Sequence, residues 1–273
     1  MFLVVFGMTG EVINFGCRLN AFESDAMAKL MDDDNMIIIN SCAVTSEASR
    51  QVRQTIRKIR RERPTARIVL TGCGADIETA EYNAMAEVDS VLLNGSKFHP
   101  QLAMTDGVVG QMARDHGAIH HGPVTRQAHA RAHLEVQNGC NHSCTFCIIP
   151  SGRGSARSVP PRQVVDNVRK LVALGHGEVV LTGVDLTSYG EDIGPQMRLG
   201  HLVASILEDV PELRRLRLSS IDAIELDDLL FQLVTEEPRI MPHLHLSLQS
   251  GDNMILKRMK RGHQRDEAIN LRQ

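Results

Sequence analysis

Short apolar runs that alternate with amphipathic stretches constrain the fold of the first half of this chain most strongly. The runs cover residues 12–15, 36–40, 67–71 and 90–94, each bounded by turn-forming residues. Continuous apolar runs of this length are typical of strands buried on both faces of a parallel sheet. Helical segments are predicted between them, at about 20–31, 46–62 and 76–87. Because strand and helix alternate, we predict a small open parallel α/β sheet.

The same alternation returns in the second half, after a stretch with little periodicity. Strands are expected at 134–137, 178–182, 213–219 and 243–248, and helices at 161–175, 200–209, 225–236 and from about 252. We therefore predict an N-terminal domain over 1–98, a linker over 99–132 and a second domain over 133–273. The linker is rich in histidine, but these histidines lack the regular spacing of metal ligands.

Length and composition exclude several classes of protein. A chain of 273 residues has room for one large or two medium domains with a sizeable core. It contains no run of eighteen apolar residues, and residues 1–8 lack the features of a signal peptide, so no membrane span is expected. That first segment is interpreted as an extra strand or as residues upstream of the true start. Six cysteines are too few for a disulfide framework and favour a reducing, cytoplasmic setting.

Three cysteines crowd into eight residues at the start of the second domain. Cys140, Cys144 and Cys147 have spacings x3 and x2. Thiolates are the preferred ligands of iron–sulfur clusters, and a four-iron cluster on three of them leaves one iron open to a small molecule. Two alternatives use the same residues: a zinc site that recruits His142, and a redox dithiol formed by Cys144 and Cys147. The zinc site would require a very tight loop, so we favour the cluster.

The other three cysteines follow three predicted strands of the first domain. Cys17, Cys42 and Cys73 come directly after the first, second and third strand. The carboxyl ends of parallel strands share one side of a sheet, where ligand sites gather. A single cysteine there would be interpreted as a small buried hydrophobe. Three at equivalent positions indicate instead that the thiols converge on one point.

Both cysteine groups lie in motifs of a known family. The stretch 137–154, QNGCNHSCTFCIIPSGRG, resembles the signature of radical S-adenosylmethionine methylthiotransferases, and FGCRLN, NSCAVT and TGC resemble the segments that hold the auxiliary cluster in that family. The resemblance implies two [4Fe-4S] clusters, one on Cys140, Cys144 and Cys147 and one on Cys17, Cys42 and Cys73. It also implies S-adenosylmethionine bound at the open iron of the first cluster.

The ends of the second-domain strands supply candidate cofactor contacts. They carry glycine, hydroxyl, carboxyl and amide groups, which suit close backbone approach and hydrogen bonds to a nucleoside and an amino acid. The residues taken as S-adenosylmethionine contacts are Gly183, Asp185, Ser220 and Gln249. By the resemblance, the cofactor yields a 5′-deoxyadenosyl radical, which removes hydrogen from C2 of a modified adenine. A methylthio group, assembled at the auxiliary cluster with a second S-adenosylmethionine, then bonds to that carbon.

Two segments narrow the resemblance to one branch. TGVDLTSYG at 182–190 and HLSLQSG at 245–251 resemble the branch that acts on N6-threonylcarbamoyladenosine at position 37 of tRNA. The alternatives are a methylthiotransferase for isopentenyladenosine tRNA or a ribosomal protein, or an inactive iron–sulfur or RNA-binding fragment. The last alternative is kept because the family has a six-stranded partial (β/α) barrel and a C-terminal RNA-binding barrel. We expect this chain to be truncated, lacking the last barrel strands and that RNA-binding domain.

A cationic helix is the predicted nucleic-acid contact. Residues 50–67 hold eight cations and one acid, and the arginines of the predicted helix fall opposite Val52, Ile56 and Ile59. With a net charge of −3 for the whole chain, phosphate binding must come from such a local patch. The charge pattern alone fits a solvated face equally well. The family resemblance favours the anticodon loop of tRNA as partner of the helix from Arg50 to Arg67, and implies an electron-donating reductant as second partner.

Overall fold

The computed structural model describes residues 3–6, 10–112, 122–125, 127, 130–222 and 226–270. The chain divides into two compact units, and a short segment of the second half of the sequence belongs to the first unit. The first unit comprises Met1–Ala128 together with Ser151–Gly154, and the second comprises His129–Pro150 and Ser155–Gln273. Each unit is described by itself.

The first unit is built on a six-stranded sheet in the order β1-β2-β3-β4-β5-β6. The strands are β1 (Leu3–Phe6), β2 (Glu11–Asn14), β3 (Met36–Ser41), β4 (Arg67–Gly72), β5 (Ser90–Leu92) and β6 (Gly107–Val109). All neighbours pair in parallel except β1, which pairs antiparallel with β2. The interpretation of the first residues as an extra strand is therefore confirmed for Leu3–Phe6, and the predicted parallel α/β sheet is confirmed as well.

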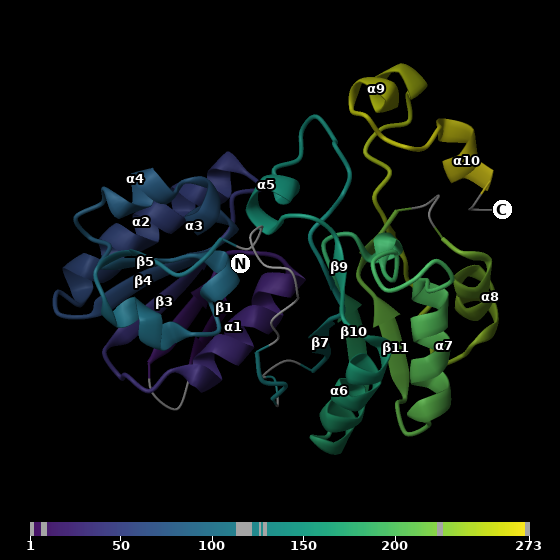
Figure 1. The fold of residues 1–273 in the computed structure, drawn as a ribbon, viewed down its shortest axis with the longest axis horizontal. Helices are drawn as coiled ribbons and strands as arrows, with labels where there is room; N and C mark the ends of the chain where they lie inside the picture. The colour runs from purple at the N-terminus through teal and green to yellow at the C-terminus, as the bar shows by residue number, and fades with distance from the viewer. Residues whose placement is uncertain are drawn as a thin grey trace. The chain divides into compact units, whose positions relative to one another are not determined.

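Helices cover both faces of this sheet, as Figure 1 shows. On one face α2 (Ser46–Glu62) buries Val52, Ile56 and Ile59 against strand residues, in a cluster shared with α3 (Cys73–Ile77) and α4 (Thr79–Asn83). On the other face α1 (Arg18–Leu30) buries Met27 against the sheet. Burying each large aliphatic side chain contributes about 1.5–3 kcal/mol, so this packing fixes α2 with its cations outward.

Two expectations for the first unit are corrected. The helix predicted at 76–87 is two short helices, because the chain turns at Glu78, whose backbone leaves the helical region (φ −112°, ψ 37°). The predicted linker from residue 99 contains a 3-10 helix, η2 (Pro100–Met104), and the edge strand β6. The strand β6 has only three residues and begins at Gly107 with φ 91°. Such a short and irregular strand leaves no recognisable periodicity in the sequence. Histidines 116, 120, 121 and 129 lie outside the described residues.

The second unit contains a parallel arc of strands. β7 (Ala132–Glu135), β10 (Glu178–Thr182) and β11 (Arg215–Leu218) form a sheet in the order β11-β10-β7, and β12 (Ser220–Ile221) pairs in parallel with β13 (His245–Leu246). The hairpin pair β8 (Gln137–Asn138) and β9 (Arg157–Ser158) frames the cysteine loop. The four predicted strands are therefore present, but the one expected at 243–248 is only two residues long, and neither of these residues is fully buried.

The helices of the second unit follow the strands as predicted, except that the last, expected from about residue 252, is two short helices. α6 (Pro161–Ala173) starts with a proline at its first turn and is followed by Gly175 at φ 93°. α7 (Leu199–Asp209), α8 (Asp228–Glu236), α9 (Asn253–Arg258) and α10 (Arg265–Asn270) complete the unit. Figure 1 shows α6 and α7 on the same side of the β7–β10–β11 sheet. The strand ends that carry the site therefore lie at one edge of a scaffold held by buried aliphatic residues.

Candidate functional site

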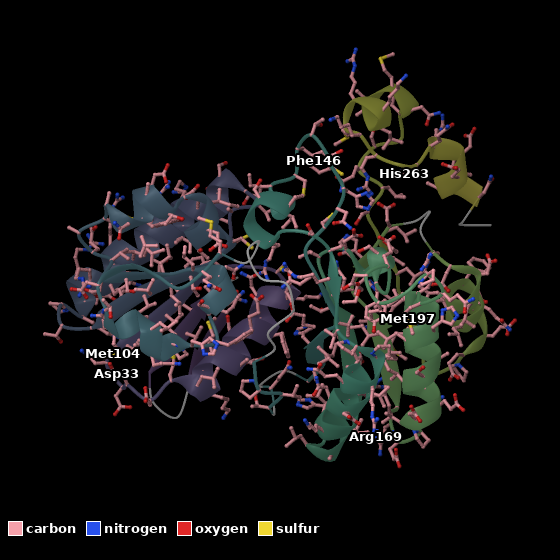
Figure 2. The ribbon with its side chains drawn as sticks, in the orientation of Figure 1. Asp33, Met104, Phe146, Arg169, Met197 and His263 are labelled. Carbon is pink, nitrogen blue, oxygen red and sulfur yellow. The ribbon has the colours of Figure 1, made fainter. Side chains whose placement is uncertain are left out.

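The cysteine loop of the second unit follows β8 and leads to the start of α5 (Ile149–Arg153). Cys147 N donates to Cys144 O over 3.1 Å, which closes the second half of the loop. Thr145 ties the loop to α9, since its N donates to Met259 O (3.2 Å) and its Oγ1 to Arg258 O (3.3 Å). Cys140, Cys144 and Cys147 are all half-buried. Phe146, labelled in Figure 2, lies on the same loop and is 50% exposed, so the loop presents thiols and an aromatic ring at an accessible surface.

The three cysteines line a pocket of about 640 Å³, counting the solvent at its mouth. Its other wall comes from the carboxyl ends of the parallel strands. The wall residues are Val184, Asp185, Ser220, Ile221, Asp222, Ser247 and Gln249. Asp185, Ser220 and Gln249 therefore lie where the sequence predicts cofactor contacts.

Gly183 is not among the pocket-lining residues and packs instead against Gln137. A Cβ added at Gly183 would lie 2.8 Å from Gln137 Oε1 and 3.0 Å from Gln137 O. Gln137 is fully buried; its Oε1 accepts from Val184 N (3.1 Å) and Asp185 N (2.9 Å), and its Nε2 donates to Gly139 O (2.7 Å). Gln137 thus joins the turn after β10 to the start of the cysteine loop. Gln137 begins the cysteine motif at 137–154, but nothing in the sequence indicates that its side chain connects these two segments.

Asp185 lies beside the first cysteine of the loop. The Cys140 thiol donates to Asp185 Oδ2 over 3.4 Å, and His142 Nε2 lies 3.3 Å from the same oxygen. Burial, and then the Asp185 carboxylate, raise the pKa of the Cys140 thiol to about 12. A thiol in this environment ionises when a cation takes the place of its proton. The donor set is therefore suited to a positively charged metal group.

The positions of the three sulfurs bear on whether they could share one metal ion. Within the described residues, Cys140, His142 and Asp185 are the set of potential ligands whose atoms lie within 4.8 Å of one another. Ligands of one tetrahedral zinc ion lie about 3.8 Å apart, given Zn–S bonds of about 2.3 Å. Cys140, Cys144 and Cys147 do not form such a set, so at least one pair of their sulfurs lies more than 4.8 Å apart. Wider spacing suits a cluster in which each thiolate binds a different iron.

An ion pair absent from the sequence predictions forms one side of the pocket. Arg261, from the segment after α9, pairs with Asp222, donates to Ser247 O (3.0 Å) and directs Nη1 at Cys144 Sγ over 3.7 Å. His263, labelled in Figure 2, is 3% exposed and contacts Leu248 O at 3.0 Å. Arg261 thereby brings a fixed positive charge to the cysteine loop. Its distance of 117 residues from Cys144 hides this contact from sequence patterns.

The first unit gathers its three cysteines at neighbouring strand ends. Cys17 precedes α1 after β2, Cys42 follows β3, and Cys73 is the first residue of α3 after β4. Although the Cys17 residue is exposed, protein atoms surround its sulfur, and this burial raises the pKa of the thiol. Burial also raises the pKa of Cys42, and Cys73 and Cys17 raise it further by their charge. The three cysteines therefore follow neighbouring strands of one sheet, near enough for their thiols to affect one another's pKa.

The backbone at this end of the sheet admits little variation. Gly72 has φ 92°, and a Cβ there would lie 2.4 Å from Ser41 O and 2.5 Å from Asn40 Oδ1. Buried Asn40 donates from Nδ2 to Asn20 O (3.0 Å) and Ser24 Oγ (3.1 Å). Three further buried side chains adjoin the cysteines and were not predicted: Glu23, Lys97 and Arg153.

The cations of α2 are less available than the sequence suggests. Acids from other elements pair with several of them, as in Arg53–Glu78 (2.9 Å), Arg60–Asp89 (2.5 Å) and Arg63–Glu11 (2.8 Å). The sequence count included only acids within the helix and its flank. Arg57 remains 58% exposed, with Glu87 at 3.8 Å, and Arg61 is an exposed residue.

No helix in the described part of the chain is long and apolar enough to cross a membrane. Residues 134–271 match the family model of the radical SAM superfamily, and residues 10–93 match that of uncharacterized protein family UPF0004. Similar curated proteins include the threonylcarbamoyladenosine tRNA methylthiotransferases MtaB of Rickettsia prowazekii (45% identity, 95% of this chain, 63% of the relative) and of Aquifex aeolicus (36%, 92% and 65%). A tRNA-2-methylthio-N(6)-dimethylallyladenosine synthase of Carboxydothermus hydrogenoformans is 31% identical (95% and 64%).

The chain thus spans about three fifths of the length of the curated relatives it matches. Among solved structures, the radical S-adenosylmethionine methyltransferase TsrM of Kitasatospora setae has a similar fold, with a TM-score of 0.59 and 15% identity over 91% of this chain and 56% of the other. The family model covers the arc of strands, the cysteine loop and the pocket. The chain therefore belongs to the radical SAM superfamily, whose members use S-adenosylmethionine and a [4Fe-4S] cluster.

Proposed function

We propose that this chain is a tRNA methylthiotransferase that adds a methylthio group to C2 of N6-threonylcarbamoyladenosine at position 37. The observation that carries the proposal is a pocket lined by Cys140, Cys144 and Cys147, in a chain 45% identical to a relative named for this reaction. The three thiols hold a four-iron cluster with one open iron. The three sulfurs do not all lie within 4.8 Å of one another, which supports this assignment over a zinc ion.

The residues of the pocket wall position the cofactor. Asp185, Ser220 and Gln249 offer a carboxylate, a hydroxyl and an amide to its polar groups, while Gln137 fixes the turn that carries Asp185. When bound at the open iron, S-adenosylmethionine supplies the radical that breaks an unactivated C–H bond. The chain's own contribution is to seat the reacting carbon, to hold the cofactor and to limit water at the site. No side chain is required as a general base.

We further propose a second four-iron cluster on Cys17, Cys42 and Cys73. Its support is the position of these cysteines at three neighbouring parallel strand ends, where burial and the nearby cysteines raise the pKa values of Cys17 and Cys42. Anaerobically reconstituted protein is then expected to hold about eight iron atoms per chain, four for each cluster. About four, unchanged when these three cysteines become alanine, would refute the second cluster.

The partner of α2 is proposed to be the phosphate backbone of the tRNA anticodon loop. Arg57 and Arg61 are the arginines that support it, since Arg53 and Arg60 are engaged with acids. Replacing Arg57 and Arg61 with glutamine should weaken binding of different tRNAs about equally and lower the salt slope by roughly one unit per lost contact. Arg169→Gln, at an exposed arginine of α6, is the control. Binding that stays the same at low salt would identify the α2 cations as a solvated face only.

The test of the reaction is the mass of modified nucleosides. A strain that lacks methylthiolation is complemented with this chain, and its tRNA is digested and analysed. Methylthio-threonylcarbamoyladenosine is the expected product, in a reducing cytoplasm with a cellular electron donor. Methylthiolated isopentenyladenosine instead would transfer the activity to the other tRNA branch. No methylthio product from a chain that holds both clusters would identify an inactive fragment.

A further inference from the structure

Arg153 is among the most completely buried large side chains in the described part of the protein, with 1% of its surface exposed. It belongs to Ser151–Gly154, the segment that packs within the first unit. Its Nε donates to Cys73 Sγ over 3.1 Å, and its Nη2 donates to Asn20 Oδ1 (2.9 Å) and Glu23 Oε2 (3.2 Å). Its Nη1 pairs with Glu23 Oε1. The guanidinium is therefore held on one side by a carboxylate and directed on the other at a cysteine.

A second buried cation shares the same carboxylate. Lys97 is 4% exposed, and its Nζ lies 2.6 Å from Glu23 Oε2. Burial alone would raise the pKa of Glu23, but Arg153 and Lys97 lower it to about 2, so the carboxylate is ionised at neutral pH. Burial and the neighbouring Arg153 lower the pKa of Lys97, while its ion pair with Glu23 raises it. With Lys97 protonated in that ion pair, two cations and one anion leave a net charge of +1 in a buried site. An uncompensated buried charge is strongly unfavourable, so a negative group must lie beside it.

The cysteines are the negative groups within reach. Asn20 Oδ1 accepts both from Arg153 and from the Cys17 thiol (3.5 Å), so Arg153 is linked to two of the three thiols. A four-iron core of charge 2+ on three thiolates carries a net charge of −1, and −2 after reduction by one electron. The surplus charge of the buried group equals that of the oxidised site in magnitude and is opposite in sign.

We propose that Arg153, together with Lys97 and Glu23, is a positioning group for the cluster on Cys17, Cys42 and Cys73, and that it raises the reduction potential of that cluster. This inference rests on the second cluster of the proposed function. Net charge and hydrogen bonds to the sulfurs set the potential of such clusters. A fixed positive charge and an N–H directed at Cys73 stabilise the reduced form, which is the more negative of the two.

The experiment uses all 273 residues with Cys140, Cys144 and Cys147 replaced by alanine, so that one cluster remains. After anaerobic reconstitution, iron and sulfide per chain are measured, followed by a redox titration monitored by electron paramagnetic resonance. Arg153→Gln is expected to shift the potential to more negative values, and Arg153→Lys, which keeps the charge, to recover part of the shift. Arg169→Gln should leave the potential unchanged.

Neutralising Glu23 and Arg153 separately and together distinguishes an electrostatic role from simple packing. Glu23→Gln raises the net charge of the group and should shift the potential upward, while Glu23→Gln combined with Arg153→Gln restores a charge of +1 and should return the potential toward the parent. Packing alone predicts no such reversal. Lys97→Met, which leaves the Cys73 contact intact, should shift the potential in the same direction as Arg153→Gln and covers the case in which the latter loses its cluster. The inference is overturned if the parent and the single variants Lys97→Met, Glu23→Gln and Arg153→Gln all have the same reduction potential. A parent chain that binds no iron would instead refute the second cluster itself.

Discussion

Replacing Gln137 with leucine tests how far one buried side chain holds the cofactor pocket together. Leucine has a similar volume but no polar atoms, so the change removes every hydrogen bond of the amide while keeping the site filled. Gln137 is fully buried and joins the turn at Val184 and Asp185 to Gly139 at the start of the cysteine loop. We expect the second unit to lose stability and the turn to lose its fixed position.

The magnitude follows from the groups left without a partner. Two backbone N–H groups, of Val184 and Asp185, lose their acceptor, and Gly139 O loses a donor. An unsatisfied buried group costs about 1–3 kcal/mol, and the turn is half-buried, so water will replace part of this loss. The expected destabilisation is about 2–4 kcal/mol. With a urea m-value of about 1–3 kcal/mol/M, the unfolding midpoint of this unit should fall by roughly 1–2 M.

Urea unfolding, hydrogen exchange and cofactor binding form the assay. Exchange at the amides of Val184 and Asp185 should accelerate by more than the global change in stability requires, and S-adenosylmethionine should bind more weakly to the reconstituted protein. Gln232→Leu is the matched control, because Gln232 lies on α8 with an exposed bond to Glu236. A Gln137→Leu protein within about 0.5 kcal/mol of wild type, with protected turn amides, would refute the reasoning.

Three further predictions concern the fold around the sites. Gly175 has φ 93° with open space around it, so Gly175→Ala should lower the free energy of unfolding by about 1–2 kcal/mol through backbone strain alone. Gly72→Ala should lower it by about 1–3 kcal/mol more, because the added Cβ meets the neighbouring strand; equal urea midpoints for the two variants would contradict this. Asp227→Ala removes the acceptors for Leu230 N at the start of α8 and for Gly200 N in α7, so it should lower the free energy of unfolding by about 2 kcal/mol. Asp252→Ala removes a single cap and should lower it by about 1 kcal/mol, a difference that thermal unfolding can measure. Because the pKa of Glu23 is lowered to about 2, below its unfolded value, its stabilisation is present above about pH 4.3 and is lost as the pH falls toward 2; the difference in melting temperature between wild type and Glu23→Gln should shrink over that range, and a constant difference would count against an ionised Glu23.

Periodicity predicts the long elements of this chain well. The helix predicted at 46–62 and the strand at 178–182 have the observed bounds, because a strong apolar stripe or a fully buried run determines each. It fails where tertiary contacts decide. The break at Glu78 and the edge strand Gly107–Val109 depend on packing against distant strands and have no local pattern.

The candidate sites show the same division. That Asp185, Ser220 and Gln249 lie in one pocket with Cys140, Cys144 and Cys147 could be predicted, because the carboxyl ends of parallel strands share one side of a sheet. Arg261 and Arg153 could not, since their partners lie 117 and 80 residues away in the sequence. The α2 cations were overestimated for the same reason, because Glu78 and Asp89 come from other elements.

Because Ser151–Gly154 packs within the first unit, neither unit corresponds to one uninterrupted stretch of the gene. A recombination event that joined Met1–Ala128 to a foreign partner would deliver Glu23 and Lys97 without Arg153, and Cys73 without its guanidinium. The recombinant that retained residues 129–273 would carry Arg153 without Glu23, the carboxylate with which it pairs. Only exchanges that move the four-residue segment along with the first unit preserve the arrangement. The two units are therefore expected to be inherited jointly, as a pair that shuffling of whole domains cannot separate without loss.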